Sequence, residues 1–157
     1  MNCILVDSRQ KKGKHDLKHE QMMSAGINLI RCALPWGDYI AAPRVAVDTK
    51  QDILEIAGNL CGCASEKRRV REEIKKANDA GCKLIFLIED KRFHEIDDLY
   101  GRKFRLHNGQ TIPGDQLAVA MTVMQERYQC EFWFSDPEES ARVIRELLED
   151  GYGGIPE

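Results

Sequence analysis

The sequence lacks the long apolar segments and the charged leader that mark membrane and secreted proteins. None of its apolar runs approaches the roughly 20 residues that are needed to cross a bilayer. The N-terminal stretch 1–7 has neither the positive start nor the apolar middle of a signal peptide, and it is typical of a β-strand instead. We therefore expect a cytoplasmic, intracellular protein that makes no membrane contact.

A strong net charge of either sign is also missing. The formal net charge is −3 at pH 7, so bulk attraction would not hold this chain on a nucleic acid. The basic residues are nevertheless clustered, at 11–15, 67–71 and 102–107. Carboxylates that bind divalent cations would cancel some of the acidity. The charge distribution permits DNA binding and does not require it.

The six cysteines form no strong metal-binding motif. Cys61 and Cys63 are close in sequence, but neither a CxxC spacing nor a second pair accompanies them. Disulfides are not expected in a reducing compartment. Free and mostly buried thiols are the favoured interpretation. A zinc or thiol site centred on this pair is the alternative, and it predicts bound zinc and loss of stability on chelation.

The chain has the size of one domain and alternates strand and helix patterns. Its 157 residues, 43% of them hydrophobic, suffice for one core. The patterns predict strands over 2–7, 27–32, 36–41, 45–50, 83–90 and 130–134. They predict helices over 14–25, 52–60, 66–80 and 113–125, and a last helix capped by Ser135 or Asp136. We expect an α/β domain over 1–150 with a central sheet, a long connector over 91–111 and a flexible tail over 151–157.

The sharpest functional signal is a hairpin that carries acidic residues. If its turn is centred on Pro43, residues whose numbers sum to 86 face each other, and Asp38 lies opposite Asp48. Two like charges in such a pair destabilise a sheet, whereas Mg²⁺ or Mn²⁺ would be bound by both carboxylates. Strand period puts Lys50 on the face of Asp48, where an ammonium can stabilise a scissile phosphate or help activate water. The hairpin therefore indicates phosphodiester hydrolysis. The alternative is that Asp48-Thr49-Lys50 is a chance Asp-x-Lys string on a charged edge strand and has no catalytic role.

Several segments resemble, in order and spacing, the nuclease motifs of the XPF-type structure-specific endonucleases. These segments are Val6-Asp7-Ser8-Arg9, Gly37-Asp38-Tyr39-Ile40, Val47-Asp48-Thr49-Lys50 and the apolar strand 84–89. The family belongs to the PD-(D/E)xK, restriction-endonuclease-like superfamily. The resemblance is dense over residues 3–90 and continues to about 149. It implies a restriction-endonuclease-like core, with a central mixed β-sheet flanked by helices.

The resemblance also implies roles for individual residues. The expected metal ligands are Asp7, Asp38 and Asp48, with Mg²⁺ or Mn²⁺ as the cofactor. The expected catalytic residues are Arg9, Asp38, Asp48, Lys50 and Glu73. The basic cluster on helix 66–80, apart from the resemblance, gives the expected DNA contacts, which are Lys67, Arg68, Arg69 and Arg71. For Arg9, Arg69 and Glu73, exposed charges on a strand end and a helix are the alternative.

The sequence departs from the family in its third motif and in its length. That motif usually reads Glu-Arg-Lys, and here Asp48 and Lys50 keep the acid and the lysine while Thr49 replaces the arginine. Gln10 stands where a glutamate commonly follows the first motif. The helix-hairpin-helix and helicase domains of many relatives do not fit in this chain. The resemblance therefore implies branched or structured DNA as the substrate without showing how that DNA is recognised.

We predict a metal-dependent endodeoxyribonuclease, of prokaryotic or viral origin and acting in recombination or repair. The alternative is a catalytically inactive nuclease fold that binds DNA or a protein partner. A homodimer through the apolar helix 113–127 is a further expectation, and simple burial of that helix is its alternative.

Overall fold

The computed structural model describes residues 3–11, 13–41 and 45–150, and it contains the central mixed sheet that the sequence predicted. The six strands of this sheet are ordered β2-β1-β3-β4-β5-β8. The strands are β1 (Cys3–Asp7), β2 (Asn28–Cys32), β3 (Tyr39–Ala41), β4 (Val45–Lys50), β5 (Lys83–Glu89) and β8 (Cys130–Ser135). The helices are α1 (Asp16–Ser24), α2 (Ile53–Cys61), α3 (Ala64–Asp79), α4 (Gly114–Arg127) and α5 (Ser140–Asp150).

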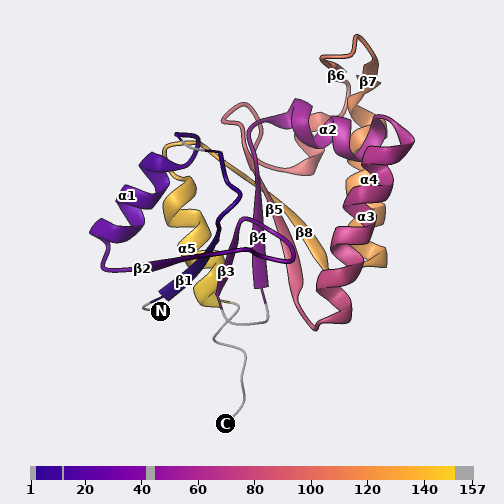
Figure 1. The fold of residues 1–157 in the computed structure, drawn as a ribbon. Coiled ribbons are helices and arrows are strands. Elements are labelled where there is room, and N and C mark those ends of the chain that lie inside the picture. The colour runs from indigo at the N-terminus through magenta and orange to yellow at the C-terminus, as the bar shows by residue number, and fades with distance from the viewer. Residues whose placement is uncertain (1–2, 12, 42–44, 151–157) are drawn as a thin grey trace.

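The sheet separates two helical layers. In Figure 1, α1 and α5 lie on one side of the strands, and α2, α3 and α4 lie on the other. None of the helices in the described ranges is long and apolar enough to cross a bilayer.

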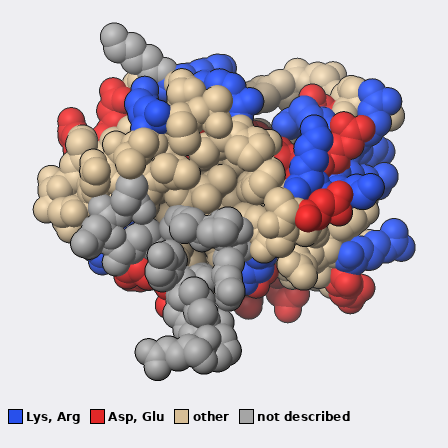
Figure 2. All heavy atoms as spheres, turned by 60° about the horizontal axis from the view of Figure 1, so that its bottom comes forward, with Lys and Arg blue, Asp and Glu red and all other residues tan. Residues whose placement is uncertain are grey.

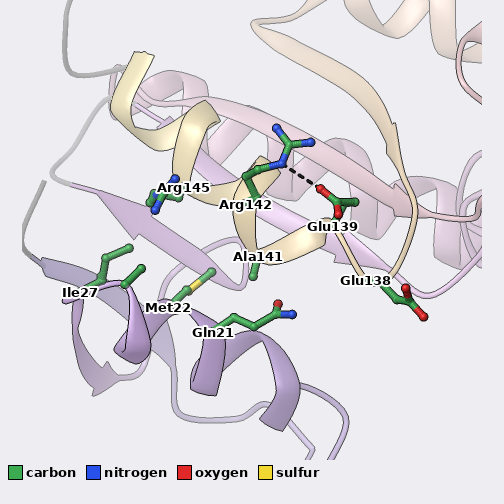
Figure 3. Close-up of a pocket in the computed structure, with 9 residues that line it drawn as sticks. Gln21, Met22, Ile27, Glu138, Glu139, Ala141, Arg142 and Arg145 are labelled. Atoms are coloured by element: carbon green, nitrogen blue, oxygen red, sulfur yellow. Dashed lines mark hydrogen bonds and ion pairs between the residues drawn. The ribbon is translucent and has the colours of Figure 1, made fainter.

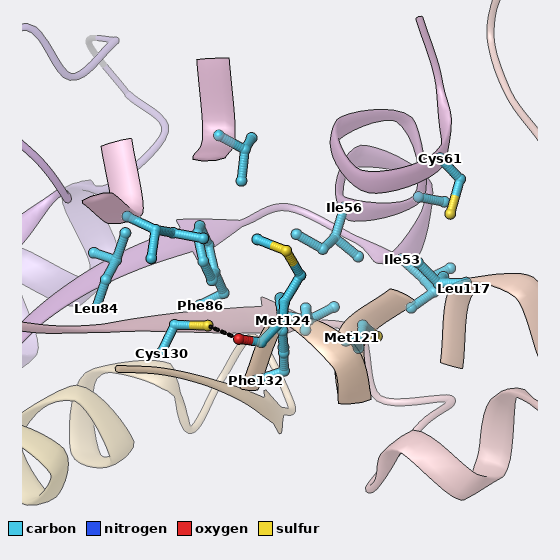
Figure 4. Packing of buried hydrophobic residues seen from close by; sticks show 14 of the residues in the cluster. Ile53, Ile56, Cys61, Leu84, Phe86, Leu117, Met121, Met124, Cys130 and Phe132 are labelled. Carbon is cyan, nitrogen blue, oxygen red and sulfur yellow. Dashed lines mark hydrogen bonds between the residues drawn. The ribbon is translucent and has the colours of Figure 1, made fainter. Parts of the chain in front are cut away.

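Each layer packs on its own hydrophobic core. The larger core lies under α2, α3 and α4, and Figure 4 shows Met124 of α4 beside Phe86 of β5. Phe86 stacks on Phe132 of β8 with ring centroids 5.2 Å apart. The smaller core lies under α1 and α5 and includes Ile144 of α5. Because β5 is covered on both faces, its apolar run 84–88 is buried throughout.

The register of the hairpin is the predicted one. Tyr39 pairs with Val47 and Ile40 with Ala46, so the paired numbers sum to 86. The turn at 42–44 lies outside the described residues. Strand β3 is antiparallel to both β1 and β4, and β4 is parallel to β5. The carboxyl ends of β1, β4 and β5 therefore meet at one edge of the sheet, together with the start of β3.

The long connector is more structured than its sequence suggested. It contains the short 3-10 helix η1 (Ile96–Leu99) and the paired strands β6 (Lys103–Arg105) and β7 (Thr111–Pro113). Apolar side chains along it are buried, including Phe93, Leu99 and Phe104. Gly114 closes the segment, because its amide donates to the Arg102 carbonyl at 2.8 Å and a Cβ there would collide with the Leu99 carbonyl oxygen. The connector is thus part of the larger core.

The last helix begins later than predicted. The Glu139 amide donates to the Asp136 carbonyl, and the Glu138 amide donates to the Asp136 carboxylate. These bonds form a turn, and regular helix starts at Ser140. The predicted apolar face is confirmed for Ile144, Leu147 and Leu148, which are buried. The expected tail over 151–157 lies outside the described residues.

Candidate active site

Asp38 is held at the start of β3 by its neighbours on both sides. Its amide donates to the Val47 carbonyl at 2.8 Å, and its carbonyl accepts from the Asp7 amide at 2.9 Å. Gly37 precedes it with φ +67, and a side chain at Gly37 would lie 3.2 Å from the Ala46 Cβ. Only glycine adopts this backbone freely and allows this close approach. The glycine of the second motif therefore turns the chain so that Asp38 meets both strands.

The Asp38 carboxylate lies against the end of β4. Its Oδ2 accepts a hydrogen bond from the Thr49 amide at 2.9 Å and another from the Thr49 hydroxyl at 2.7 Å. The backbone ladder is irregular here, because the Asp38 amide bonds to Val47 instead of to residue 48. The predicted position of Asp38 directly opposite Asp48 is therefore replaced by contacts of Asp38 with Val47 and Thr49, the residues on either side of Asp48.

Asp48 and Lys50 form a buried ion pair. The Lys50 Nζ lies 2.6 Å from the Asp48 Oδ1, and the two side chains are 5% and 13% exposed. Burial, together with the charges of Asp38 and Glu73, raises the pKa of Asp48 to about 6 against the opposing effect of Lys50. Burial alone would lower the pKa of Lys50, but the Asp48 carboxylate outweighs this effect and raises it. Lys50 is therefore held as an ammonium ion.

Asp7 is engaged by Arg9 at the end of β1. The Arg9 Nε and Nη2 donate to both carboxylate oxygens at 2.8–3.0 Å, and Nη2 also donates to the Leu34 carbonyl. Burial opposes ionisation of Asp7, but the hydrogen bonds and charge of Arg9 outweigh it and lower the pKa of this carboxyl. The prediction that Arg9 supports the carboxylates agrees with this contact. Its guanidinium is 64% exposed and can also meet a solvent-borne phosphate.

Glu73 reaches the same site from α3. Its Oε1 accepts from the Gly37 amide at 3.1 Å, and its Oε2 lies 3.7 Å from the Arg69 Nη1. Its charge contributes to the raised pKa of Asp48. The structure thus brings the five predicted catalytic residues together, from the turn after β1, the residue before β3, the end of β4 and α3.

The donor set suits a hard divalent cation at two of the three predicted ligands. Asp38 is bonded to Thr49, the neighbour of Asp48, so both acids supply carboxylate oxygens at the end of β4. Burial and the charge of Asp38 raise the pKa of Asp48, and a bound cation would favour its ionised form. Arg9 donates to both oxygens of Asp7, whereas Lys50 contacts only the Oδ1 of Asp48 among the described residues. Within the described ranges, no set of three or more His, Cys, Asp and Glu side chains is arranged to hold a metal ion. Asp38 and Asp48 therefore fit the cation best, and Asp7 joins them only if Arg9 turns away.

The basic residues of α3 separate into different environments. Arg69 lies 3.0 Å from Glu66 and faces the acidic site, whereas Arg68 approaches Glu72 at 4.0 Å. Figure 2 shows the Lys and Arg side chains mixed with Asp and Glu on the right of the view, the side that carries α3. Lys67 and Arg71 of α3, together with Arg127 of α4, line a groove of about 200 Å³ between α2, α3 and α4.

A separate cavity lies between α1 and α5. Its volume is about 290 Å³, and Figure 3 shows Met22 and Ile27 on one wall and Ala141 and Arg142 on the other. Arg142 is paired with Glu139 at its mouth at 2.8 Å. None of the predicted site residues lines it.

Some contacts of the site were not visible in the sequence. The Gln10 side chain donates to the Asp38 carbonyl at 3.2 Å, where the family commonly has an acid. On the other face of the sheet, the Tyr39 hydroxyl lies 3.0 Å from the His15 Nδ1 and 3.3 Å from the His19 Nε2. The spacing of two histidines on one helical face was the available signal for this cluster. Lys18 of α1 also forms a buried pair with Glu89 at 2.8 Å.

Cys61 and Cys63, the alternative site, lie at the junction of α2 and α3. Cys61 is buried and Cys63 is exposed. The Cys63 Sγ lies 3.1 Å from the Ser65 hydroxyl, which lowers the pKa of the thiol. Burial raises the pKa of Cys61. The two thiols thus occupy different environments.

Comparison with known proteins identifies one family and one fold. A family model described as the ERCC4 domain matches residues 6–147. The structure of XPF from Aeropyrum pernix is similar with a TM-score of 0.60 and 21% identity, over 93% of this chain and 64% of that chain. A structure of XPF from Aeropyrum pernix in complex with DNA is similar with a TM-score of 0.70 and 20% identity, over 100% of this chain and 68% of that chain. No curated protein matches the sequence. The chain therefore spans about two thirds of these structures and shares their restriction-endonuclease-like fold, as predicted.

Proposed function

The chain belongs to the ERCC4 domain family as an XPF-type nuclease domain, and from this premise we propose that it is a divalent-metal-dependent DNA endonuclease. Its substrate would be branched or otherwise structured DNA, in recombination or repair inside a prokaryotic or virus-infected cell. The observation that carries this proposal is the meeting of Asp38, Asp48 and Lys50 at one sheet edge, with Lys50 2.6 Å from Asp48. An ordinary sheet gains nothing from two acids at this point.

The residues of the site have separable roles in phosphodiester hydrolysis. Asp38 and Asp48 would hold Mg²⁺ or Mn²⁺, which supplies charge neutralisation and Lewis-acid polarisation of the phosphate when bound. The Lys50 ammonium, kept charged by Asp48, would stabilise the negative charge that develops on the scissile phosphate. The exposed guanidinium of Arg9 would contact the neighbouring phosphate. The Glu73 carboxylate would hold the turn at Gly37 by accepting a hydrogen bond from the Gly37 amide.

DNA is the proposed ligand of the basic side of α3. The similar structure of XPF in complex with DNA supports this proposal, as does the lack of an ion-pair partner for Lys67 and Arg71 among the described residues. Such cations bind the phosphate backbone of DNA and add affinity without sequence specificity.

A homodimer through α4 is supported less strongly. Leu117, Met121 and Met124 are buried in this chain's own core, and Val119 is 53% exposed. Most of the apolar surface of α4 is therefore explained without a second copy.

A second candidate function is an inactive scaffold that binds DNA or a protein. The observation that favours it is that two of the three predicted metal ligands are paired with cations of the same chain, Asp7 with Arg9 and Asp48 with Lys50. A site closed in this way would bind no metal.

Cleavage assays separate the two functions. Labelled duplex, single-stranded, flap, fork and four-way-junction DNAs are incubated with Mg²⁺, Mn²⁺ or EDTA, beside the variants Asp48→Asn and Lys50→Ala. We expect metal-dependent cutting that falls at least about a thousandfold in both variants, because each removes a charge that acts on the reacting phosphate. Glu131→Gln is the matched control, since its carboxylate pairs with Lys83 on the same sheet away from the site. Binding without cutting under every metal condition would favour the scaffold, and wild-type cutting by either variant would sink the assignment.

A further inference from the structure

Thr49 is buried where the third motif departs from its usual pattern. It lies between Asp48 and Lys50 and is 3% exposed. Both of its donors, the backbone amide at 2.9 Å and the hydroxyl at 2.7 Å, bond to the same oxygen of Asp38, Oδ2. No donor within the described ranges bonds to the other oxygen, Oδ1. The two bonds therefore fix the carboxylate group and leave one oxygen free to coordinate.

The carboxylate needs this restraint because of its surroundings. The Glu73 carboxylate accepts from the amide of Gly37, the residue before Asp38, and the Asp38 carboxylate accepts from Thr49, the residue after Asp48, so three acidic residues meet at this point. The terminal torsion of an aspartate is soft, and such a group turns readily away from like charge. A hydrogen bond from a hydroxyl to a charged acceptor is strong enough to oppose this rotation.

We propose that the Thr49 hydroxyl is a positioning residue that holds Asp38 beside Asp48, so that the free Asp38 oxygen and the Asp48 carboxylate form one seat for a divalent cation. This inference rests on the proposed function, because it concerns the cation that the nuclease would use. It assigns to Thr49 a role that the amide alone does not fill, since the amide is present at any residue in this position.

Four residues at position 49 isolate the hydroxyl from the size of the side chain. Threonine and Thr49→Val have the same shape, and Thr49→Ser and Thr49→Ala form a smaller pair that again differs by the hydroxyl. Mn²⁺ binding to the metal-free protein is measured by calorimetry, and the metal dependence of DNA cleavage is measured in parallel. Thr122→Val on α4 is the matched control, because its hydroxyl bonds only to a helix carbonyl.

We expect the dissociation constant for Mn²⁺ to rise roughly tenfold in Thr49→Val and in Thr49→Ala, and to stay within about twofold of wild type in Thr49→Ser. Cleavage at saturating Mn²⁺ should recover to near the wild-type rate in Thr49→Val, because the metal itself then holds the carboxylate. A merely structural role would instead lower the melting temperature and the rate at every metal concentration. If Thr49→Val fails to fold, the serine and alanine variants give the same comparison.

Each outcome bears on the inference. Equal Mn²⁺ affinity in the hydroxyl and hydroxyl-free variants would overturn it while leaving the nuclease intact. An equal loss of Mn²⁺ affinity in all three variants would also overturn it, because the shape of the side chain and not the hydroxyl would then determine the affinity. A wild-type protein that neither binds Mn²⁺ nor cuts DNA with it would overturn the proposed function, and this inference with it.

Discussion

Two buried pairs of lysine and carboxylate lie on opposite faces of the sheet and differ in their surroundings. Lys50 and Asp48 lie 2.6 Å apart beneath α2 and α3, over the ring of Phe86. Lys18 of α1 and Glu89 at the end of β5 lie 2.8 Å apart and are 9% and 7% exposed. Burial raises the pKa of Asp48, and the further negative charges of Asp38 and Glu73 beside the first pair add to this effect. The second pair joins a helix to a strand and matches one positive charge with one negative charge.

The difference separates a pair that supports the fold from a pair that costs stability. A buried ion pair in which each charge is matched is lost at a large cost when one partner is removed. A carboxylate whose pKa is raised in the folded state destabilises that state once it ionises. The excess of acid around Lys50 is therefore a cost of folding that metal binding would relieve, whereas Lys18 and Glu89 hold α1 on the sheet.

Removing one carboxyl charge from each pair should give stability changes of opposite sign. Glu89→Gln leaves Lys18 buried without its partner, and we expect a loss of about 3 kcal/mol in the free energy of unfolding at pH 7. Asp48→Asn removes the ionisation that burial disfavours, and Lys50 still faces the charges of Glu55 and Glu73, so we expect a gain of about 1–3 kcal/mol. Urea unfolding of the metal-free proteins measures both. A gain in Glu89→Gln, or a loss in Asp48→Asn, would end the contrast between the two pairs.

The gain in Asp48→Asn should depend on pH. The folded-state pKa of Asp48 is raised to about 6 from an ordinary 3.8. The protonated carboxyl therefore contributes its full stabilisation of the folded wild-type protein below pH 3.8, and this stabilisation is lost as the pH rises through 6. The difference between variant and wild type should thus be full above pH 6 and shrink toward pH 4. A difference that stays constant across this range would show that ionisation is not its cause.

The face that carries Lys18 should show the opposite dependence on pH through His15. Burial lowers the pKa of His15 to about 4 from 6.5, against the opposing charge of Asp38. The neutral ring is thus favoured in the folded state. Its contribution to the free energy of unfolding is full above pH 6.5 and is lost as the pH falls toward 4. We expect the melting temperature of wild type to fall more steeply over this range than that of His15→Gln. Parallel curves for the two proteins would contradict the assignment.

The smallest effects should come from the exposed cations outside both pairs. Arg71→Ala should change stability by less than about 0.5 kcal/mol, because it removes an exposed side chain. It should reduce the slope of log DNA affinity against log salt by about 1, if Arg71 neutralises one phosphate. Arg142→Ala on α5 is the comparison, since that residue is paired with Glu139 and Glu146. An equal change of slope in the two variants would remove α3 from the DNA contact.

The sequence predicted the parts of the site that depend on strand geometry. The alternation of a strand and the position of Pro43 were enough to place Asp38 near Asp48, and the pairing of Tyr39 with Val47 confirms that register. The strand and helix patterns predicted an α/β domain with a central sheet, and the family resemblance implied that this sheet is mixed and flanked by helices. The strand patterns depend on residues close together in the chain.

The parts that escaped prediction depend on distant contacts or on local backbone. The bond between Glu73 and Gly37 requires α3 to pack against the start of β3, and no local pattern reports that packing. The irregular ladder at Asp38 comes from the positive φ of Gly37, which moves the carboxylate to Thr49. In the connector, Phe93, Leu99 and Phe104 are spaced without a helical or strand period, so their burial was not visible.

The tight closure at Gly114 has a consequence for the reading of genetic variation in this protein. A single-nucleotide change that replaced this glycine would bring a Cβ against the Leu99 carbonyl and separate η1 from the start of α4. Such an allele would alter none of the acidic residues, yet it would behave as a null through loss of folded protein. A screen that scored function alone would assign the lesion to the catalytic centre, and a measurement of protein abundance would correct that assignment.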